Sequence, residues 1–275
     1  MEEGDPDMLQ IVIPAYNEQD RLPRTLRELR RHVLRCRPVT GPVEVVVVDN
    51  ASTDATAALA AAADSPALPV RVVHCATPGK GAAVRAGIGA TDAPVVGFMD
   101  ADGATRLDAI DEAWRRLALG ADVAIGSRSA TGSWTEARHS WLRAGGARAY
   151  RHCTARIVPG VADTQCGFKL MRGDLGRSLF ADLAATGFAF DVELLALARV
   201  RGARVEEIPV VWTDVPGSTF DPLRHGLGSF AELAAIAWRV RSARAVQPAV
   251  PPILQPVLQP AFTSVATDYP FAVEA

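Results

Sequence analysis

Short runs of β-branched residues alternate with segments of helical spacing in the first half of the chain. Strands are expected at residues 9–14, 43–48, 70–74, 94–99 and 122–126. Helices are expected around residues 22–33, after Thr53, after Gly81 and around residues 107–119. Continuous apolar strands separated by helices are typical of a mostly parallel sheet covered by helices on both faces. The fold class is therefore α/β.

The second half of the chain is less regular. A helix is expected at residues 190–200, a strand at residues 205–212, and a helix at residues 223–244. We expect residues 8–245 to form one domain. The prolines of residues 246–275 predict an extended or disordered tail.

Composition and charge exclude several classes of protein. The chain has 275 residues, 49% of them hydrophobic, and a formal net charge of -2, which disfavours nucleic acid as a partner. The cysteines lack a C-x-x-C pair, and no secretory leader or uninterrupted apolar span is evident. We therefore expect a cytoplasmic enzyme whose membrane contact, if it has any, is peripheral.

Two aspartates, Asp100 and Asp102, follow a predicted buried strand on a short turn. Ligands of parallel sheets bind beyond the carboxyl ends of the strands. Two hard oxygen ligands at this spacing suit Mg²⁺ or Mn²⁺, whose shell a diphosphate would complete. The alternative interpretation is a loop with two solvated acids.

Two further strand ends carry candidate residues. Asp49 follows the second strand, where it can bind a nucleoside or simply begin a turn. Lys80 lies between two glycines before a helix, and only Lys80 and Lys169 are lysine among the 29 basic residues. The Gly-rich loops of P-loop and dinucleotide-binding proteins are both missing.

Seven short motifs occur together in one order, and in this order they resemble the family-2 glycosyltransferases. Within that family the chain is most similar to the dolichyl-phosphate glucosyltransferase type, which acts on polyprenyl phosphates. The resemblance covers about residues 9–244. The motifs occupy residues 11–18, 45–54, 79–85, 100–105, 126–128, 163–169 and 190–193.

The resemblance implies the GT-A nucleotide-sugar fold, and it assigns the donor site. Asp100 and Asp102 match residues that bridge a Mg²⁺ or Mn²⁺ ion to the donor diphosphate. The residues expected around the nucleotide sugar are Pro14, Ala15, Tyr16, Glu18, Asp49, Lys80, Asp100 and Ala101.

The resemblance also assigns catalytic residues. Arg128, Arg138 and Lys169 match basic residues that face the acceptor phosphate and the donor diphosphate, although each is alternatively a solvated charge. Asp191 matches the candidate base, and Asp102 acts through the metal. A hydroxyl acceptor needs a base, whereas a phosphate is already ionised, so the role of Asp191 depends on the acceptor.

The leading hypothesis is inverting, metal-dependent transfer of a hexose, glucose from UDP-glucose, to a polyprenyl phosphate at the inner face of the cell membrane. The alternative retains the donor but uses a soluble sugar, nucleoside or natural product as acceptor. Two departures from the family pattern are the Gly217-Ser218-Thr219 run, which lacks an expected lysine, and Asn50, where a second carboxylate is common.

The helix expected at residues 223–244 bears on the acceptor. Its apolar face is expected to contain Leu227, Phe230, Leu233, Ala237 and Trp238, followed by Arg239, Arg241 and Arg244. This is the layout of an interfacial helix on an anionic leaflet. An ordinary amphipathic helix packed on the sheet has the same pattern.

Overall fold

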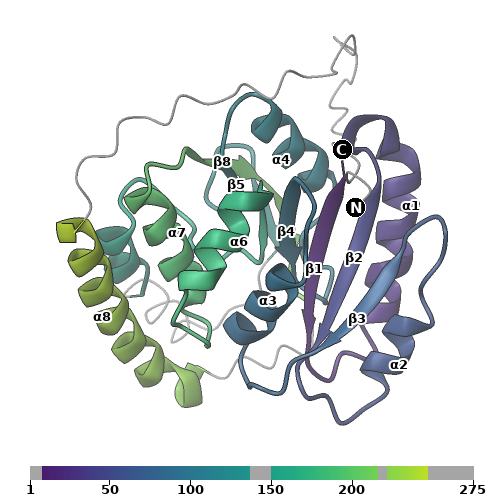
Figure 1. Cartoon of the computed structure of the whole chain (residues 1–275), viewed down its shortest axis with the longest axis horizontal. Helices are drawn as coiled ribbons and strands as arrows, with labels where there is room; N and C mark the ends of the chain where they lie inside the picture. Colours follow the sequence, from purple (N-terminus) through teal and green to yellow (C-terminus); the bar gives the residue numbers. More distant parts are fainter. Residues whose placement is uncertain (1–7, 137–149, 216–221, 247–275) are drawn as a thin grey trace.

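A computed structural model describes residues 8–136, 150–215 and 222–246 of the chain, and its centre is a seven-stranded sheet (Figure 1). The strand order is β3-β2-β1-β4-β7-β5-β8. These strands are β1 (Leu9–Ala15), β2 (Val43–Asp49), β3 (Val70–His74), β4 (Val95–Met99), β5 (Val123–Ser127), β7 (Phe168–Arg172) and β8 (Val205–Pro209). All are parallel to their neighbours except β7, which is antiparallel to β4 and β5. The expected mostly parallel sheet is confirmed.

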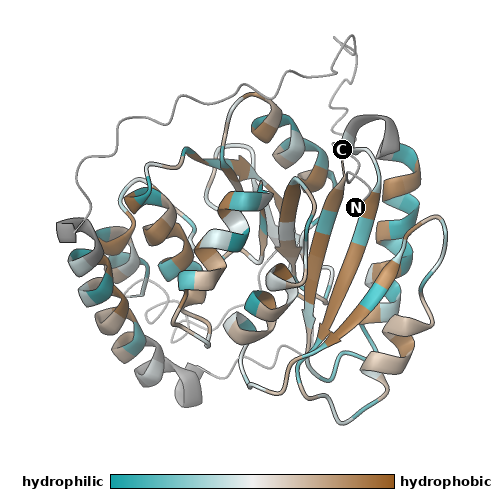
Figure 2. Cartoon of the chain, viewed as in Figure 1, coloured by the Kyte–Doolittle hydropathy of each residue, from teal (hydrophilic) through white to brown (hydrophobic). Residues whose placement is uncertain are grey.

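Helices cover both faces of this sheet (Figure 1). They are α1 (Leu22–Thr40), α2 (Thr56–Ala61), α3 (Lys80–Gly89), α4 (Asp108–Ala118), α6 (Gly173–Asp182), α7 (Phe190–Val200) and α8 (Pro222–Val246), and residues 150–157 are also helical. The central strands are largely hydrophobic (Figure 2). Alternate β1 residues face opposite layers: Val12 packs in the core with α3, α6 and α7, while Ile11 and Ile13 pack with α1 and α4.

Strand β7 was not predicted, and it changes the architecture. Its residues come long after β5 in the chain, yet they pair with β4 on one side and β5 on the other. This register places Lys169 opposite Phe98 and Ile125. We predicted one strand at residues 205–212, but the structure divides this segment into β8 and a short β9 (Val211–Thr213). Strand β9 pairs with β6 (Trp134–Glu136) in a second sheet.

Helix α8 is confirmed, and the apolar face that we predicted for it is divided between core and surface: Leu233 is buried, whereas Phe230 and Trp238 are not. The buried positions are Leu233, Ile236 and Val240, which recur at helical spacing and pack in the same core as α7. Phe230 is 37% exposed and Trp238 is 71% exposed. No helix of the described residues is long and apolar enough to cross a membrane.

Candidate active site

The loops that follow β1 and β2 are tied to each other at the carboxyl ends of these neighbouring strands. The Asn17 amide N–H donates to the Ser52 hydroxyl (3.1 Å), and the Thr53 N–H donates to the Asn17 side chain (2.9 Å). Asn17 and Ala51 both have positive φ, at 53° and 59°. Non-glycine residues are strained there, and such strain is common at ligand sites.

The residues predicted to surround the nucleotide begin at the end of β1. Pro14 is partly buried and Ala15 is buried, whereas Tyr16 is 49% exposed. Glu18 forms a two-bond ion pair with Arg21, with distances of 2.5 and 2.7 Å. Burial raises the pKa of Glu18 despite Arg21, and the charges of Asp102 and Asp100 add to this rise. Glu18 therefore belongs to the same acidic cluster as the two aspartates.

The carboxylate of Asp49 organises the end of β2. One oxygen accepts the Ser52 N–H (3.2 Å), and the other lies 3.2 Å from Nδ1 of His74, the last residue of β3. His74 was missed from sequence, and its side chain is 73% exposed. Asp49, with both carboxylate oxygens in these contacts, and His74 together form a polar surface beside the β1 loop.

The hydrogen bonds of Asn50 explain why an amide stands where a second carboxylate is common in the family. Its amide donates to the carbonyls of Cys75 (3.0 Å) and Thr77 (2.7 Å), and its carbonyl accepts the Gly79 N–H (2.9 Å). A carboxylate in this place has no N–H to donate to two carbonyl groups. Asn50 therefore fixes the loop that leads into the Gly79-Lys80-Gly81 turn.

Lys80 and Asp100 form an ion pair across the strand ends, with 2.6 Å between Nζ and Oδ1. Burial alone would lower the pKa of Lys80, but Asp100 and Asp191 raise it above its ordinary value. The structure thus brings together two residues that were predicted for the donor site, Lys80 and Asp100. Contact of the Lys80 ammonium group with a diphosphate stays a prediction.

The Asp100-Ala101-Asp102 turn is held from two sides. The Thr25 hydroxyl donates to the Ala101 carbonyl (2.7 Å), and Asp102 accepts the Ala104 N–H (3.0 Å). Burial raises the pKa of Asp102, and the neighbouring Asp100 raises it further. Ala101 is buried, at 4% exposure.

Gly167 leaves room for the carboxylate of Asp100. A Cβ atom added at Gly167 would lie 2.0 Å from Oδ2 of Asp100, which is far inside contact distance. Gly167 is in a motif that the sequence analysis quoted, but its role was missed. Only the pairing of β7 with β4 brings these two positions together.

The donor set at this turn fits a hard divalent cation that is completed by a ligand. Among the residues that the structure describes, no three His, Cys, Asp or Glu side chains are grouped to hold a metal unaided. Asp100 and Asp102 supply two carboxylates, which Mg²⁺ commonly combines with phosphate oxygens. The metal role of these two residues stays a prediction.

Lys169 and Asp191 form a buried pair behind the strand ends. Lys169 Nζ lies 2.5 Å from Asp191 Oδ1, donates to the Cys166 carbonyl (2.7 Å), and lies 5.2 Å from the centre of the Phe98 ring. The side chains are 0% and 4% exposed. Contact of Lys169 with phosphate stays a prediction, because the structure gives its ammonium group protein partners on the inside of the sheet.

Arg128 is anchored rather than free. Its Nε and Nη2 donate to the two oxygens of Asp163, at 2.7 and 2.9 Å, and its guanidinium lies 5.5 Å from the centre of the Trp212 ring. The Arg128 side chain remains 32% exposed. Arg138 and Gly217-Ser218-Thr219 lie outside the described residues, so their roles stay predictions.

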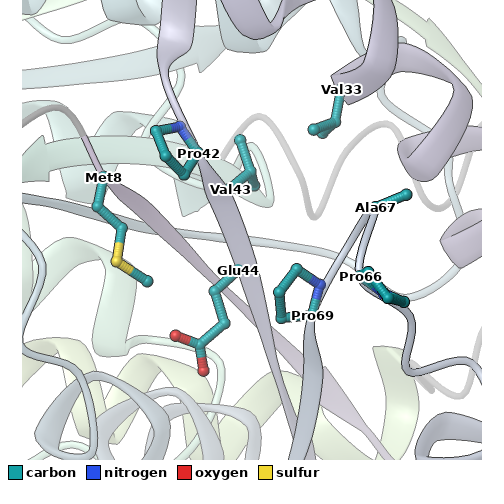
Figure 3. Close-up of a pocket in the computed structure, with 8 residues that line it drawn as sticks. All are labelled: Met8, Val33, Pro42, Val43, Glu44, Pro66, Ala67 and Pro69. Atoms are coloured by element: carbon teal, nitrogen blue, oxygen red, sulfur yellow. The ribbon is translucent and has the colours of Figure 1, made fainter. Parts of the chain in front are cut away.

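A shallow pocket lies at the opposite ends of the strands from the candidate site (Figure 3). Met8, Pro42 and Val43 line it at the amino ends of β1 and β2. Its volume is about 110 Å³, whereas ligand sites for small molecules usually have about 300–1,000 Å³. The strand-end cluster, with its convergent charges, is the better candidate site.

Comparison with known proteins adds a family and relatives. The family described as Glycosyl transferase family 2 matches residues 10–175, a segment that contains Lys80, Asp100, Asp102 and Lys169. The chain is 34% identical to the dolichyl-phosphate beta-glucosyltransferase of Drosophila melanogaster over 85% of this chain and 78% of that protein. It is 32% identical to the Homo sapiens protein of the same name over 86% and 79%.

A solved structure of similar fold is glucosyl-3-phosphoglycerate synthase from Mycobacterium tuberculosis in complex with Mn²⁺, UDP-glucose and phosphoglyceric acid. The TM-score is 0.60 at 18% sequence identity, and the match covers 88% of this chain and 81% of that chain. At this identity the similarity concerns the fold.

Proposed function

The chain belongs to glycosyl transferase family 2, and from this premise we propose that it transfers glucose from UDP-glucose to a polyprenyl phosphate with inversion. It is a glycosyltransferase of GT-A fold, as the motifs predicted. The observation that carries the donor half of the proposal is the contact between Lys80 and Asp100 across the strand ends. The names of the relatives support the acceptor half.

Asp100 and Asp102 would hold a Mg²⁺ or Mn²⁺ ion, which stabilises negative charge on a departing diphosphate. The remaining residues bind and orient the donor. Lys80 presents a fixed positive charge at the same turn, and such charge-assisted contacts to phosphate are among the stronger hydrogen bonds. The polar surface formed by Asp49 and His74 would accept hydrogen bonds from the hydroxyl and N–H groups of a nucleoside.

The buried pair of Lys169 and Asp191 favours a phosphate acceptor over a hydroxyl acceptor. A general base must reach the proton that it removes, but Asp191 is 4% exposed and is bonded to Lys169. A phosphate acceptor is ionised already and needs no such base. Asp191 then orients Lys169 and contributes to the field around Lys80.

The acceptor proposal includes peripheral contact with the cytoplasmic face of a membrane. Trp238 is 71% exposed and Arg241 is exposed on α8. An exposed tryptophan beside a basic residue is a common feature of helices that lie at a lipid interface. Arg239 is removed from this role, because it forms an ion pair with Glu193.

Radiolabelled UDP-glucose, supplied with either polyprenyl phosphate or a panel of soluble sugars and nucleosides, tests the proposal. We expect label in the lipid fraction with Mg²⁺ or Mn²⁺ and none in EDTA. Asp102→Ala and Asp100→Ala should each lower kcat by at least about 100-fold, the scale of a lost charge-stabilising contact, with the fold retained.

Arg27→Ala, on the exposed side of α1, is the control for this experiment and should keep full activity. Label in a soluble product alone would replace the lipid acceptor by a soluble one. Full activity of either aspartate variant in EDTA would contradict the metal-bound donor.

A further inference from the structure

A loop of residues 183–189 lies directly against the turn that carries Lys80. The Ala82 N–H donates to the Thr186 carbonyl (3.2 Å). A Cβ atom added at Gly79 would lie 2.3 Å from the Thr186 carbonyl oxygen, and one at Gly81 would lie 2.8 Å from that of Ala185. The two glycines therefore allow this loop to pack on the turn, so a shift of the loop toward the turn would displace the turn, and a shift away would break the Ala82 hydrogen bond.

Glu193, in the first turn of α7, holds the loop in place. Its Oε2 accepts the N–H groups of Ala184 (3.1 Å) and Ala185 (2.7 Å). Its Oε1 accepts a hydrogen bond from Nε of Arg239 on α8 (2.8 Å). The Glu193 side chain is 2% exposed, whereas that of Arg239 is 34% exposed. One buried carboxylate thus joins α8 to the loop.

A second contact joins the same two elements. Oε1 of Glu232 on α8 lies 3.4 Å from the Gly187 N, which donates to it. A Cβ atom at Gly187 would lie 3.0 Å from the other oxygen of Glu232. Helix α8 therefore contacts the loop at Gly187 and, through Glu193, at Ala184 and Ala185.

We propose that Glu193 is a positioning residue that, together with Arg239, couples the docking of α8 to the geometry of the Gly79-Lys80-Gly81 turn. Loss of the Arg239 charge leaves a buried carboxylate without its cation, which is a strongly unfavourable state. Glu193 then turns toward water, and the N–H groups of Ala184 and Ala185 lose the carboxylate oxygen that accepts from them. Lys80 loses its placement as a consequence, so the nucleoside diphosphate binds more weakly.

The inference rests on the proposed donor site, and binding of UDP tests it without an acceptor. We expect Arg239→Gln to raise the dissociation constant of UDP at least ten-fold, as measured by calorimetry in Mg²⁺. The measurement is made at a temperature where the circular dichroism of the variant is that of the folded wild type. Arg241→Gln removes an exposed arginine two positions along the same helix, and should stay within two-fold of wild type.

Two further variants separate positioning from general stability. Arg239→Lys retains the charge and should recover most of the UDP affinity. Glu232→Gln weakens only the contact at Gly187, and should reduce affinity by a smaller factor than Arg239→Gln while leaving the fold intact.

The outcomes distinguish this inference from the proposed function. If the wild-type chain does not bind UDP, the proposed function is overturned, and the inference with it. If the wild type binds UDP while Arg239→Gln and Glu232→Gln, both folded, bind it equally well, the inference alone is overturned.

Discussion

The buried pair of Lys169 and Asp191 affects the free energy of unfolding of the protein. Replacing Lys169 by Met leaves Asp191 as an unpaired buried carboxylate, for which a loss of about 3–5 kcal/mol in the free energy of unfolding is typical. We expect this loss in urea denaturation at pH 7. Replacing both members, as Lys169→Met with Asp191→Leu, should recover much of the stability.

Arg27→Met is the matched control for Lys169→Met, because Arg27 is an exposed basic residue of α1. It should change the free energy of unfolding by less than about 0.5 kcal/mol. Equal small effects at both positions would show that Lys169 is not the buried cation described above.

The pair of Arg128 and Asp163 predicts a pH dependence of stability. Burial alone would raise the pKa of Asp163, but the Arg128 bonds lower it below its ordinary value. The unfolded state therefore binds a proton more readily than the folded state. The pair contributes stability above the unfolded pKa of about 3.9, and this contribution is lost as the pH falls below that value.

Urea unfolding of wild type and Arg128→Gln between pH 7 and pH 3 measures this contribution. The difference in unfolding free energy should be largest at pH 5–7 and shrink below about pH 4. Arg106→Gln breaks an exposed pair with Asp108 and should show little effect at any pH. A constant difference would assign the effect of Arg128 to packing on Trp212 instead.

Residues of the candidate site could be proposed from the sequence where a motif marks them. Asp100 and Asp102 follow the end of β4 and Lys80 begins α3, each in a recognisable motif, and the structure brings Lys80 and Asp100 into contact. Arg21 and His74 were not predictable, because their importance arises only from partners that the fold brings near. The buried state of Lys169 was missed because a lone lysine gives no sign of its partner, Asp191.

At the scale of elements, the junction between β7 and the Asp100 turn makes a sharp prediction. Gly167→Ala places a methyl group where the Asp100 carboxylate lies, so Asp100 must rotate away from its place. We expect activity and Mn²⁺-dependent UDP binding to fall at least about ten-fold, with far-ultraviolet circular dichroism unchanged.

Gly89→Ala is the matched control for Gly167→Ala. Gly89 ends α3, and a Cβ atom there would meet nothing within 4 Å. Wild-type UDP binding by Gly167→Ala would mean that Asp100 does not act from the position described.

Most elements followed from periodicity alone, and the exceptions have physical causes. Strand β7 was missed because its five residues include Lys169 and Arg172, and a buried lysine contradicts the usual pattern of a central strand. The division of the apolar face of α8 between core and surface was not predicted, because apolar residues surround much of that helix. Spacing cannot tell which stripe meets α7 until Leu233, Ile236 and Val240 are seen in the core.

At the scale of the whole molecule, α8 predicts binding to anionic membranes. Trp238 and Arg241 should support sedimentation with vesicles that contain phosphatidylserine, but not with neutral vesicles. One arginine near such a surface contributes about 1 kcal/mol, so Trp238→Ala together with Arg241→Ala should reduce binding measurably, and added salt should do the same.

Trp134→Ala together with Arg115→Ala removes an exposed tryptophan and an exposed arginine elsewhere, and should leave vesicle binding unchanged. If the two double variants lose binding equally, α8 is not the membrane-facing element.

The insertion of β7 between β4 and β5 has a consequence for synthesis of the chain. Both neighbours of β5, which are β7 and β8, come later in the sequence, so β5 emerges from the ribosome without a partner. One edge of β4 stays open over the same interval. At translation rates of about 5–20 residues per second, this interval lasts several seconds, during which an open edge invites pairing with other chains. The nascent chain therefore exposes an unpaired edge of β5 until Pro209, the last residue of β8, has been added.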